Sequence, residues 1–355
     1  MDLSWIFDSL SQIIIFGVVI TSLLIIYLYF KQENMIFPTS INGMKYPEDN
    51  PDPYKSPLQL GLKYKEIKTI TPDNIKLVGW LVYMEENKKN RTLLYFHENA
   101  GSKSQIILYI YINIYILDLG FRLPFLEYVI VHLKMNVIIF GYRGYGKSEG
   151  TPNEQGVLID GAAVAKYVFE SKEIENYVDR EQVFLFGRSL GGAVAARVAL
   201  DMTLPFKGVI IENTFTTLGD LVDVMFPFLR YFRKYLLRTK FETIDIIGKI
   251  KRPILFCRSE KDELIPKAQM DTLYNQATGA LFKTYYAIHE GSHNDGFRTD
   301  VIGYANAIEK FINECNKYYI NNKDLKIEQN EDKKEDKDFS CTNDNSSNNE
   351  KSKVD

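Results

Sequence analysis

Residues 187–191, with the sequence GRSLG, constrain this chain more than any other feature. This G-x-S-x-G pattern directly follows an apolar run at 183–186 that is typical of a buried strand, and a small-residue helix is predicted at 192–201. A serine at a sharp strand-to-helix turn has an exposed hydroxyl and a strained backbone, and the helix N-terminus supplies positive potential beside it. The setting therefore predicts Ser189 as a nucleophile rather than a bystander in a glycine-rich turn.

A nucleophilic serine requires a general base, and histidine is the usual one. The chain has four histidines, His97, His132, His289 and His293. In sheet hydrolases that use this turn, the acid and then the histidine follow the serine, so only His289 and His293 qualify. His289 ends a strand-like run, whereas His293 lies in a polar loop at 290–296 that contains two glycines. We predict His293 as the base, with His289 as the alternative.

The group that orients this base is expected at the end of a strand between Ser189 and His293. Residues 253–258 are typical of a buried strand, and Glu260, Asp262 and Glu263 lie in the loop after it. Charged loop residues are usually just solvated. The pattern alone therefore leaves three candidate acids.

Acyl transfer also requires backbone N–H groups that bind the tetrahedral oxyanion. The amide of Leu190, immediately after the nucleophile, is one predicted donor. The second is expected in the loop at 97–102, which follows a strand-like run at 93–96. Asn99 is the preferred residue there and Glu98 is the alternative, while His97 is expected to pack beneath the loop.

These motifs resemble the alpha/beta-hydrolase superfamily, and within it the membrane-anchored serine hydrolases of the BEM forty-six-like (abhydrolase-domain thirteen-like) branch. The resemblance covers about residues 60–318 and rests on HENAG at 97–101, GYRGYGKSEG at 141–150, GRSLGG at 187–192, ENTF at 212–215, KDELIP at 261–266 and GSHND at 291–295. By position it implies Ser189, Asp262 and His293 as nucleophile, acid and base. It also implies that the N-terminal helix is a membrane anchor.

The chain departs from the family pattern in two places. Many relatives have a glycine where Glu98 stands, which affects the second oxyanion donor. The family pattern also runs almost directly from residue 102 to residue 119, whereas this chain has an apolar, Ile- and Tyr-rich insert at 103–118. This insert is expected to be foreign to the catalytic fold or to be a second membrane contact.

The N-terminus contains an uncharged apolar run at 13–30, just long enough to cross a hydrocarbon core. A cleaved signal peptide is the alternative, but Asp2 and Asp8 stand where such a peptide has basic residues, and no A-x-A-like site follows. Lys31 and Lys45 follow the span, which favours a cytosolic catalytic domain. We predict a single-pass anchor in the plasma membrane or an endomembrane.

The rest of the chain predicts an α/β fold. Strands are expected at 64–69, 76–84, 93–96, 137–142, 183–186, 208–212, 253–258 and 283–288, and helices at 157–169, 192–201, 268–276 and 301–318. This alternation predicts a mostly parallel sheet of about eight strands with helices on both faces. The predicted organisation is an anchor at 1–30, a Pro-rich linker at 31–60, the hydrolase domain at 61–319 and a charged, disordered tail at 320–355.

Residues 214–249 interrupt the alternation with an apolar, aromatic segment that contains interspersed arginines. The segment is expected to be either a helical cap over the serine or a surface helix packed on the core. Its basic side chains suit anionic lipid headgroups.

Composition excludes several classes of function. A net charge of −3 gives no reason to expect a nucleic-acid partner. The three cysteines, Cys257, Cys315 and Cys341, have no metal-ligand spacing, and no Walker motif or dinucleotide fingerprint occurs. We therefore predict a monomeric serine hydrolase without metal or cofactor that cleaves an ester or thioester of a lipid-like acyl substrate. A non-catalytic hydrolase-fold scaffold in membrane organisation or cell shape is the alternative.

Overall fold

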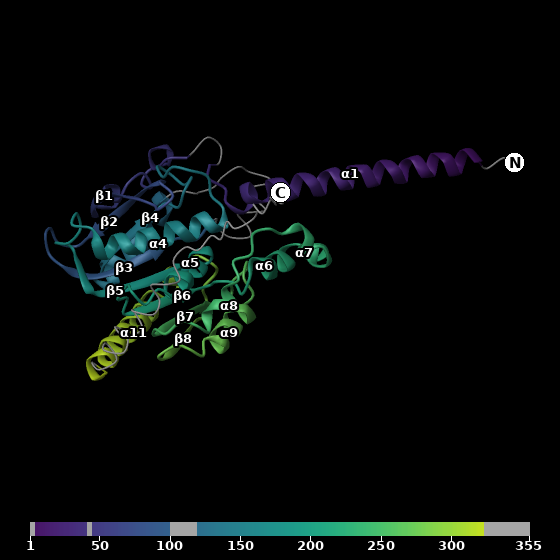
Figure 1. The fold of residues 1–355 in the computed structure, drawn as a ribbon. Coiled ribbons are helices and arrows are strands. Elements are labelled where there is room, and N and C mark those ends of the chain that lie inside the picture. Colours follow the sequence, from purple (N-terminus) through teal and green to yellow (C-terminus); the bar gives the residue numbers. More distant parts are fainter. Residues whose placement is uncertain (1–3, 41–44, 100–118, 323–355) are drawn as a thin grey trace, which may run out of the picture. The chain divides into compact units, whose positions relative to one another are not determined.

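The computed structural model describes residues 4–40, 45–99 and 119–322 (Figure 1). Within them, eight strands form one sheet in the order β1-β2-β4-β3-β5-β6-β7-β8. The first two pairings, β1 with β2 and β2 with β4, are antiparallel, and all later pairings are parallel. The strands are β1 (Lys63–Ile70), β2 (Lys76–Tyr83), β3 (Asn90–Phe96), β4 (Asn136–Phe140), β5 (Val178–Arg188), β6 (Gly208–Glu212), β7 (Ile254–Ser259) and β8 (Lys283–Ile288).

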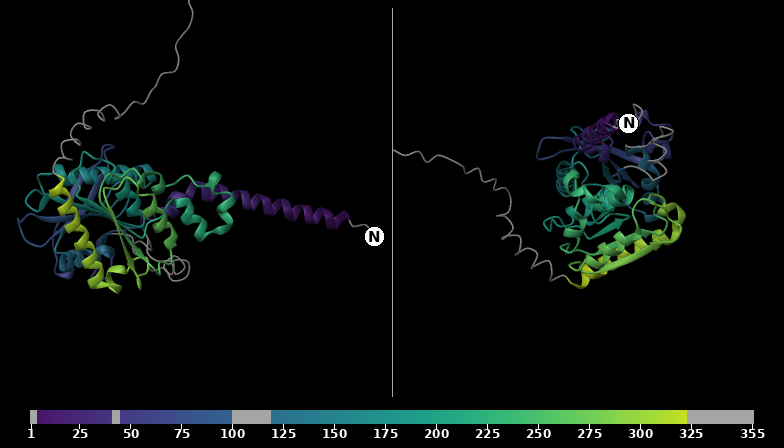
Figure 2. Two further views of the ribbon diagram at one scale, coloured as in Figure 1. Left: turned by 90° about the horizontal axis from the view of Figure 1, so that it is seen from below. Right: turned by 90° about the vertical axis from the view of Figure 1, so that its right-hand side faces the viewer.

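Alternating side chains of the strands enter two separate cores, one on each face of the sheet. In β5, Val183 and Leu185 pack in one core, whereas Phe184 and Phe186 pack in the other. The helices that contribute to the first core include α4 (Glu154–Glu170), α5 (Leu190–Val198), α8 (Thr243–Ile247) and α9 (Lys267–Gln276). Those of the second are α3 (Leu123–Tyr128), α10 (Gly296–Thr299) and α11 (Val301–Asn321). Figure 2 shows the two helical layers from the side.

The α/β architecture predicted from the sequence is confirmed, and each predicted strand is present. The main difference is β5, which begins at Val178 rather than at 183 because Val178 pairs with Asn90, ahead of an irregular stretch of β5 that precedes the Thr92–Val183 pair. The short helix α3 and the π-helical turn η4 (Val129–Leu133) were not predicted, because an element of one or two turns has too little periodicity to recognise. The insert at 103–118 and nearly all of the tail at 320–355 lie outside the described residues.

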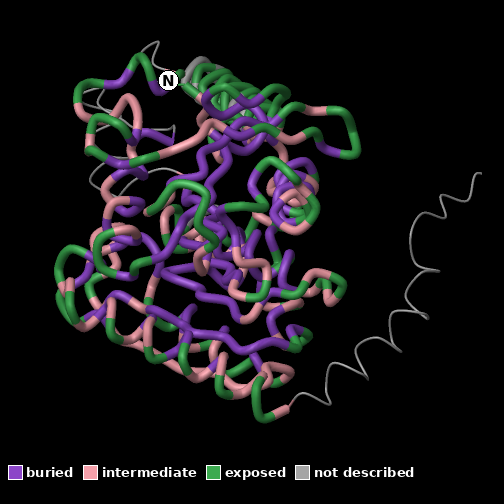
Figure 3. Tube along the Cα trace, turned by 90° about the vertical axis from the view of Figure 1, so that its left-hand side faces the viewer, coloured by how far each residue is buried: buried purple, intermediate pink, exposed green. Residues whose placement is uncertain are grey.

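The first helix, α1 (Ser4–Ile36), begins before the predicted span and ends after it. Large apolar side chains along it are exposed, such as Ile13 at 68% and Phe30 at 67%, and the helix is green along most of its length in Figure 3. Within the described residues no single helix is long and apolar enough to cross a bilayer. Two pieces of α1, Ser11–Tyr27 and Tyr29–Ile36, meet at 47° and satisfy that requirement together.

Residues 31–60 are predicted to be an extended linker, and several of the described ones pack against the domain. The segment contains the end of α1 and two 3₁₀ turns, η1 (Pro47–Asp49) and η2 (Pro57–Leu60). Phe37 is 1% exposed in the first core, and the Tyr54 ring stacks on Phe121 at 5.0 Å. Apolar side chains therefore fix this segment to the domain despite its prolines.

Residues 214–249 form a series of short helices after β6: α6 (Leu218–Met225), η5 (Pro227–Tyr231), α7 (Arg233–Leu236) and α8. We refer to α6, η5 and α7 as the cap segment. Its helices are short and its aromatic residues Tyr231, Phe232 and Tyr235 are exposed. By internal contacts the chain divides into Met1–Cys315 and Asn316–Asp355, and the described part of the second unit is the end of α11 with Asn322.

Candidate active site

Ser189 occupies the turn between β5 and α5, with a positive φ of 54° and a ψ of −121°. A residue with a side chain is strained in this region, by roughly 1–3 kcal/mol. Three hydrogen bonds hold the turn: the Ser189 amide donates to the Glu212 carbonyl at 3.0 Å, and the Ser189 carbonyl accepts from the Thr214 hydroxyl at 2.6 Å and the Gly192 amide at 2.9 Å. The surrounding structure therefore imposes the strained conformation on the serine.

The glycines around Ser189 are required by close backbone packing. A Cβ at Gly187 would lie 2.1 Å from the Gly191 carbonyl oxygen, and a Cβ at Gly191 would lie 1.9 Å from the Phe96 carbonyl oxygen. Both separations are far below van der Waals contact. Glycine is therefore required at both positions because α5 closely approaches the ends of β3 and β5.

Asp262 and His293 lie together at the same sheet edge as Ser189. They follow β7 and β8, whose carboxyl ends point the same way as that of β5 because all three strands are parallel. Asp262 Oδ2 is 2.8 Å from His293 Nδ1, and the side chains are 3% and 0% exposed. Asp262 Oδ1 accepts hydrogen bonds from the amides of Leu264 and Ile265 at 2.9 and 2.8 Å. The carboxylate is thereby fixed in orientation.

His293 has one ring nitrogen engaged and one available. Its Nε2 is buried and has no hydrogen-bond partner among the described residues, so a proton can be accepted only there. Burial lowers the pKa of His293, but the charge and hydrogen bond of Asp262 and the charge of Glu263 outweigh it, and the net direction is upward. Glu263 also accepts a hydrogen bond from the His293 amide at 3.1 Å.

Asn213 connects the loops that carry the three side chains. Its Nδ2 donates to the His293 carbonyl at 3.0 Å and to Ser259 Oγ at 2.9 Å, and its Oδ1 accepts from the Ser259 amide at 2.8 Å. The carbonyl of the preceding residue, Glu212, accepts from the Ser189 amide. The sequence reasoning gave Asn213 no role, and the only signal was its place directly after an apolar run, within ENTF at 212–215.

The two predicted oxyanion donors come from adjacent strands. Leu190 is the first residue of α5, so its amide has no acceptor within the helix. Asn99 follows β3, and its side chain is held on both sides: Nδ2 donates to the Ile36 carbonyl at the end of α1, and Oδ1 accepts from the Tyr145 hydroxyl. The Asn99 carbonyl accepts from Arg122 at 2.8 Å.

Glu98, the alternative at this loop, carries a buried charge. Its carboxylate is 3.1 Å from Arg122 Nε and accepts a hydrogen bond from the Tyr95 hydroxyl. Burial raises the pKa of Glu98, but the positive charges of Arg122 and Arg188, with the Tyr95 hydrogen bond, together lower it to about 2. Glu98 is therefore a buried carboxylate whose charge is held by two arginines.

A second buried ion pair lies beside it. Arg188, the residue before the serine, is 2% exposed and binds Glu212, which is fully buried, through hydrogen bonds of 3.0 and 3.3 Å. Tyr304 from α11 also donates to Glu212, and the Arg188 guanidinium lies 4.7 Å from the centre of the Phe125 ring. The Arg188–Glu212 pair therefore fixes the serine turn from the face of the sheet opposite α5.

The other histidines are poorly placed for this chemistry. His289 and His132 are exposed, and His289 lies just beyond the end of β8. His97 is buried against Tyr142 and Tyr145, as expected. Burial, assisted by the Arg122 charge, lowers the pKa of His97 to about 4, so its ring is neutral near pH 7.

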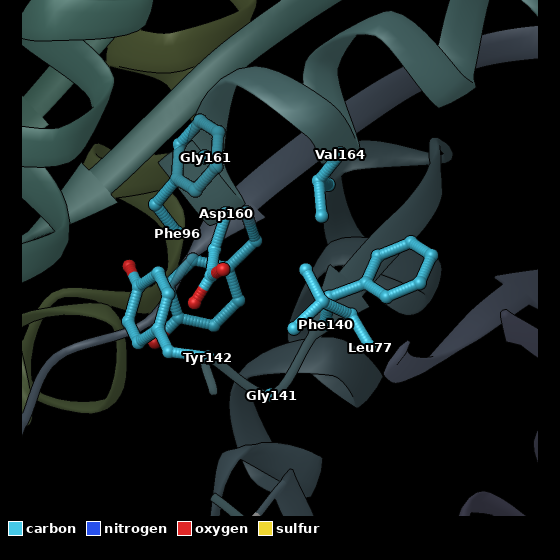
Figure 4. Close-up of a pocket in the computed structure, with 9 residues that line it drawn as sticks. Leu77, Phe96, Phe140, Gly141, Tyr142, Asp160, Gly161 and Val164 are labelled. Atoms are coloured by element: carbon cyan, nitrogen blue, oxygen red, sulfur yellow. The ribbon is translucent and has the colours of Figure 1, made fainter. Parts of the chain in front are cut away.

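A small cavity lies on the α4 side of the sheet, close to the end of β3 (Figure 4). Its lining includes Phe96, Phe140, Tyr142 and Asp160, and it has room for about one water molecule. Asp160 accepts from the Arg143 amide at 2.7 Å and from its guanidinium at 2.8 and 3.0 Å. The cavity is too small for a substrate, and within the described residues no group of His, Cys, Asp and Glu could hold a metal ion.

Comparison with known proteins identifies relatives along most of the chain. Protein bem46 of Schizosaccharomyces pombe is 30% identical over 313 residues, which are 88% of this chain and 95% of that protein. The alpha/beta hydrolase domain-containing protein WAV2 of Arabidopsis thaliana is 30% identical over 79% of this chain and 86% of its own length. An uncharacterized membrane protein of Saccharomyces cerevisiae, YNL320W, is also 30% identical, over 86% of this chain and 97% of its own.

Among solved structures, the esterase Pf2001 of Pyrococcus furiosus superposes with a TM-score of 0.54 at 18% identity, covering 73% of this chain and 93% of that chain. An α/β hydrolase of Vibrio vulnificus has a TM-score of 0.53 at 16% identity, covering 70% and 81%. These likenesses identify the fold. No protein-family model matches the chain.

Proposed function

The chain belongs to the bem46-like family of alpha/beta-hydrolase proteins, and on that premise we propose that it is a membrane-anchored serine hydrolase. The observation that carries the proposal is the buried Asp262–His293 pair at the sheet edge where the strained Ser189 turn ends β5. The proposed substrate is an ester or thioester of a lipid-like acyl group.

In the proposed mechanism Ser189 Oγ attacks the substrate carbonyl carbon while His293 Nε2 takes the hydroxyl proton. Asp262 accepts a hydrogen bond from His293 Nδ1–H, which fixes the tautomer and stabilises the imidazolium that forms. The amides of Leu190 and Asn99 would bind the oxyanion. The tetrahedral intermediate then breaks its bond to the alcohol or thiol, which leaves with the proton from His293, and an acyl-serine remains. Water, deprotonated by His293 Nε2, attacks the acyl carbon. The bond to Ser189 Oγ breaks, the acid leaves, and Ser189 regains its proton from His293.

The proposed anchor is the apolar run at 13–30 within α1. The exposed apolar side chains of α1 support it, because such a surface is stable only when covered by hydrocarbon or protein. The name of the Saccharomyces cerevisiae relative describes that relative as a membrane protein. In this proposal the catalytic domain lies on the cytosolic side of the plasma membrane or an endomembrane, which Lys31 and Lys45 after the span favour.

Labelling with a fluorophosphonate probe tests the catalytic proposal on the full chain in detergent micelles. Wild-type protein should be labelled and should hydrolyse p-nitrophenyl esters, whereas Ser189→Ala should lose both. Ser171→Ala is the matched control, because Ser171 is a similarly half-buried serine at the C-terminal end of α4. A series of oxygen esters and thioesters of increasing acyl length then defines the substrate. A folded wild-type protein that neither labels nor turns over would favour the non-catalytic scaffold.

A further inference from the structure

The cap segment exposes an unusual group of side chains: Arg230, Tyr231, Phe232, Lys234 and Tyr235, which we call the cap patch. Tyr231 is 81% exposed, Phe232 58% and Tyr235 76%. Exposed aromatic clusters of this kind mark an interaction surface. We propose that the cap patch lies in the headgroup layer of an anionic bilayer and holds the Ser189 edge of the sheet at the membrane surface. This inference rests on the proposed anchor.

The cap segment is hydrogen-bonded to α1 close to the C-terminal end of the apolar run at 13–30. Gln32 Nε2 donates to the Leu236 carbonyl at 3.0 Å, and the Arg238 amide donates to Gln32 Oε1 at 2.8 Å. The Arg238 guanidinium also lies 5.2 Å from the centre of the Tyr29 ring. Measured along the helix, the run at 13–30 is about 27 Å long, close to the thickness of the hydrocarbon core, and the 47° bend after Tyr27 lies at its C-terminal end. Gln32 therefore falls just outside the hydrocarbon, and α7 lies at the same level.

The chemistry of the cap patch matches that layer. Tyrosine rings concentrate at membrane interfaces, where one end of the ring is apolar and the other is hydrated. Each basic side chain near an anionic surface is worth about 1 kcal/mol, or about a fivefold change in binding. Arg233 is already neutralised, because its guanidinium lies 3.0 and 2.9 Å from Asp220 and Asp223.

The two basic residues of the cap patch, Arg230 and Lys234, are the ones that can contact lipid headgroups. The Arg230 side chain is 74% exposed, and its nearest acidic partner, Asp223, is 4.0 Å away and is shared with Arg233. Lys234 is exposed and has no ion pair with any residue that the structure describes. Asp220 and Asp223 together carry one negative charge more than Arg233 balances, and that excess offsets Arg230 in part, whereas Glu33 pairs with Arg238 and Lys234 has no acidic partner among the described residues.

The same end of α1 contacts the catalytic edge of the sheet. The Ile36 carbonyl accepts from the side chain of Asn99 after β3, and Phe37 packs on Phe241, with ring centres 6.1 Å apart. The cap segment also follows the carboxyl end of β6, and that end lies at the edge that carries Ser189. An acyl ester that resides in the bilayer could therefore reach the serine without crossing water.

Spin labels at three depths test the placement in the full chain, reconstituted in vesicles of phosphatidylcholine with 30% phosphatidylserine. Cys341→Ser removes one thiol, and Cys257 and Cys315 are fully buried. Labels are then placed by Ile20→Cys in the proposed span, Tyr235→Cys in the cap patch and Lys166→Cys on the exposed side of α4. Relative to Lys166, the Tyr235 label should be several-fold less accessible to a nickel chelate and more accessible to oxygen.

The outcomes separate the two proposals. A Tyr235 label that is as accessible to nickel as Lys166, with Ile20 protected, would overturn the docking surface and leave the anchor intact. A nickel-accessible Ile20 label would overturn the anchor itself, and the docking surface with it. Fluorophosphonate labelling of Ser189 in the same vesicles reports catalytic competence independently of both.

A pair of activity measurements tests the consequence for substrate access. The double variant Arg230→Gln/Lys234→Gln should lower hydrolysis of a vesicle-embedded ester by up to about 30-fold at low salt. Hydrolysis of a water-soluble ester should stay unchanged, because neither residue contacts the catalytic groups. The matched control Lys88→Gln/Lys89→Gln removes the same charge from the exposed turn before β3. Equal loss on both substrates, or equal loss in the control, would contradict the proposal.

Discussion

The Arg188–Glu212 pair gives a quantitative test of how the serine turn is held. Replacing Arg188 by Met keeps an unbranched side chain of similar length beneath the turn but removes its charge. Glu212, which is 0% exposed, would then keep only the Tyr304 hydroxyl and lose the two hydrogen bonds of 3.0 and 3.3 Å. A fully buried carboxylate would be left without a counter-charge.

The expected cost is about 3–5 kcal/mol, which is typical when one partner of a buried ion pair is removed. In a domain of this size each kcal/mol lowers the melting temperature by about 2–4 °C, so Arg188→Met should melt about 10 °C lower than wild type. Glu212→Leu should cost a similar amount, because it strands the guanidinium. The double variant Arg188→Met/Glu212→Leu should lose at least about 2 kcal/mol less stability than the two single variants lose together. In the double variant neither buried charge is left without its partner.

The assay is thermal unfolding of the full chain in detergent micelles, followed by near-UV circular dichroism. Lys166→Met is the matched control, because the Lys166–Glu170 pair is 3.7 Å long and both side chains are more than 60% exposed. Its loss should stay within about 0.5 kcal/mol. The reasoning is refuted if Arg188→Met melts within 2 °C of the control, or if the two single losses simply add.

Three further predictions concern the catalytic residues. Because the pKa of His293 is raised and only its neutral form accepts a proton, kcat/KM for a soluble ester should rise with pH, with a midpoint above the ordinary histidine value of 6.5. Glu263→Gln should shift this midpoint to lower pH, whereas Glu290→Gln, on an exposed side chain, should not. Ser189→Gly should be inactive yet about 1 kcal/mol more stable than Ser189→Ala by thermal melting, since glycine accepts a φ of 54° without strain. Gly191→Ala should prevent folding, seen as aggregation in size-exclusion chromatography, whereas Gly17→Ala, with open space at its Cβ, should leave the elution profile unchanged.

The sequence alone determined the order of the elements and the position of the serine turn. Strand and helix signals are local: the apolar run of 183–186 and the glycines around Ser189 predict a strand, a turn and a helix without any distant contact. The parallel order of β5 to β8 then places the loops that contain Ser189, Asp262 and His293 at one edge, because parallel strands end on the same side. This much follows from periodicity and chain order.

Only the tertiary structure separated residues that look alike in the chain. Of the three acids in one loop, Asp262 contacts His293 Nδ1, Glu263 contacts the His293 amide, and Glu260 pairs with Arg258. The roles of Asn213, Glu98 and Arg188 likewise depend on partners 24 to 80 residues away in the chain. Burial and charge pairing are set by which strands become neighbours, and that information is absent from any single local window of the sequence.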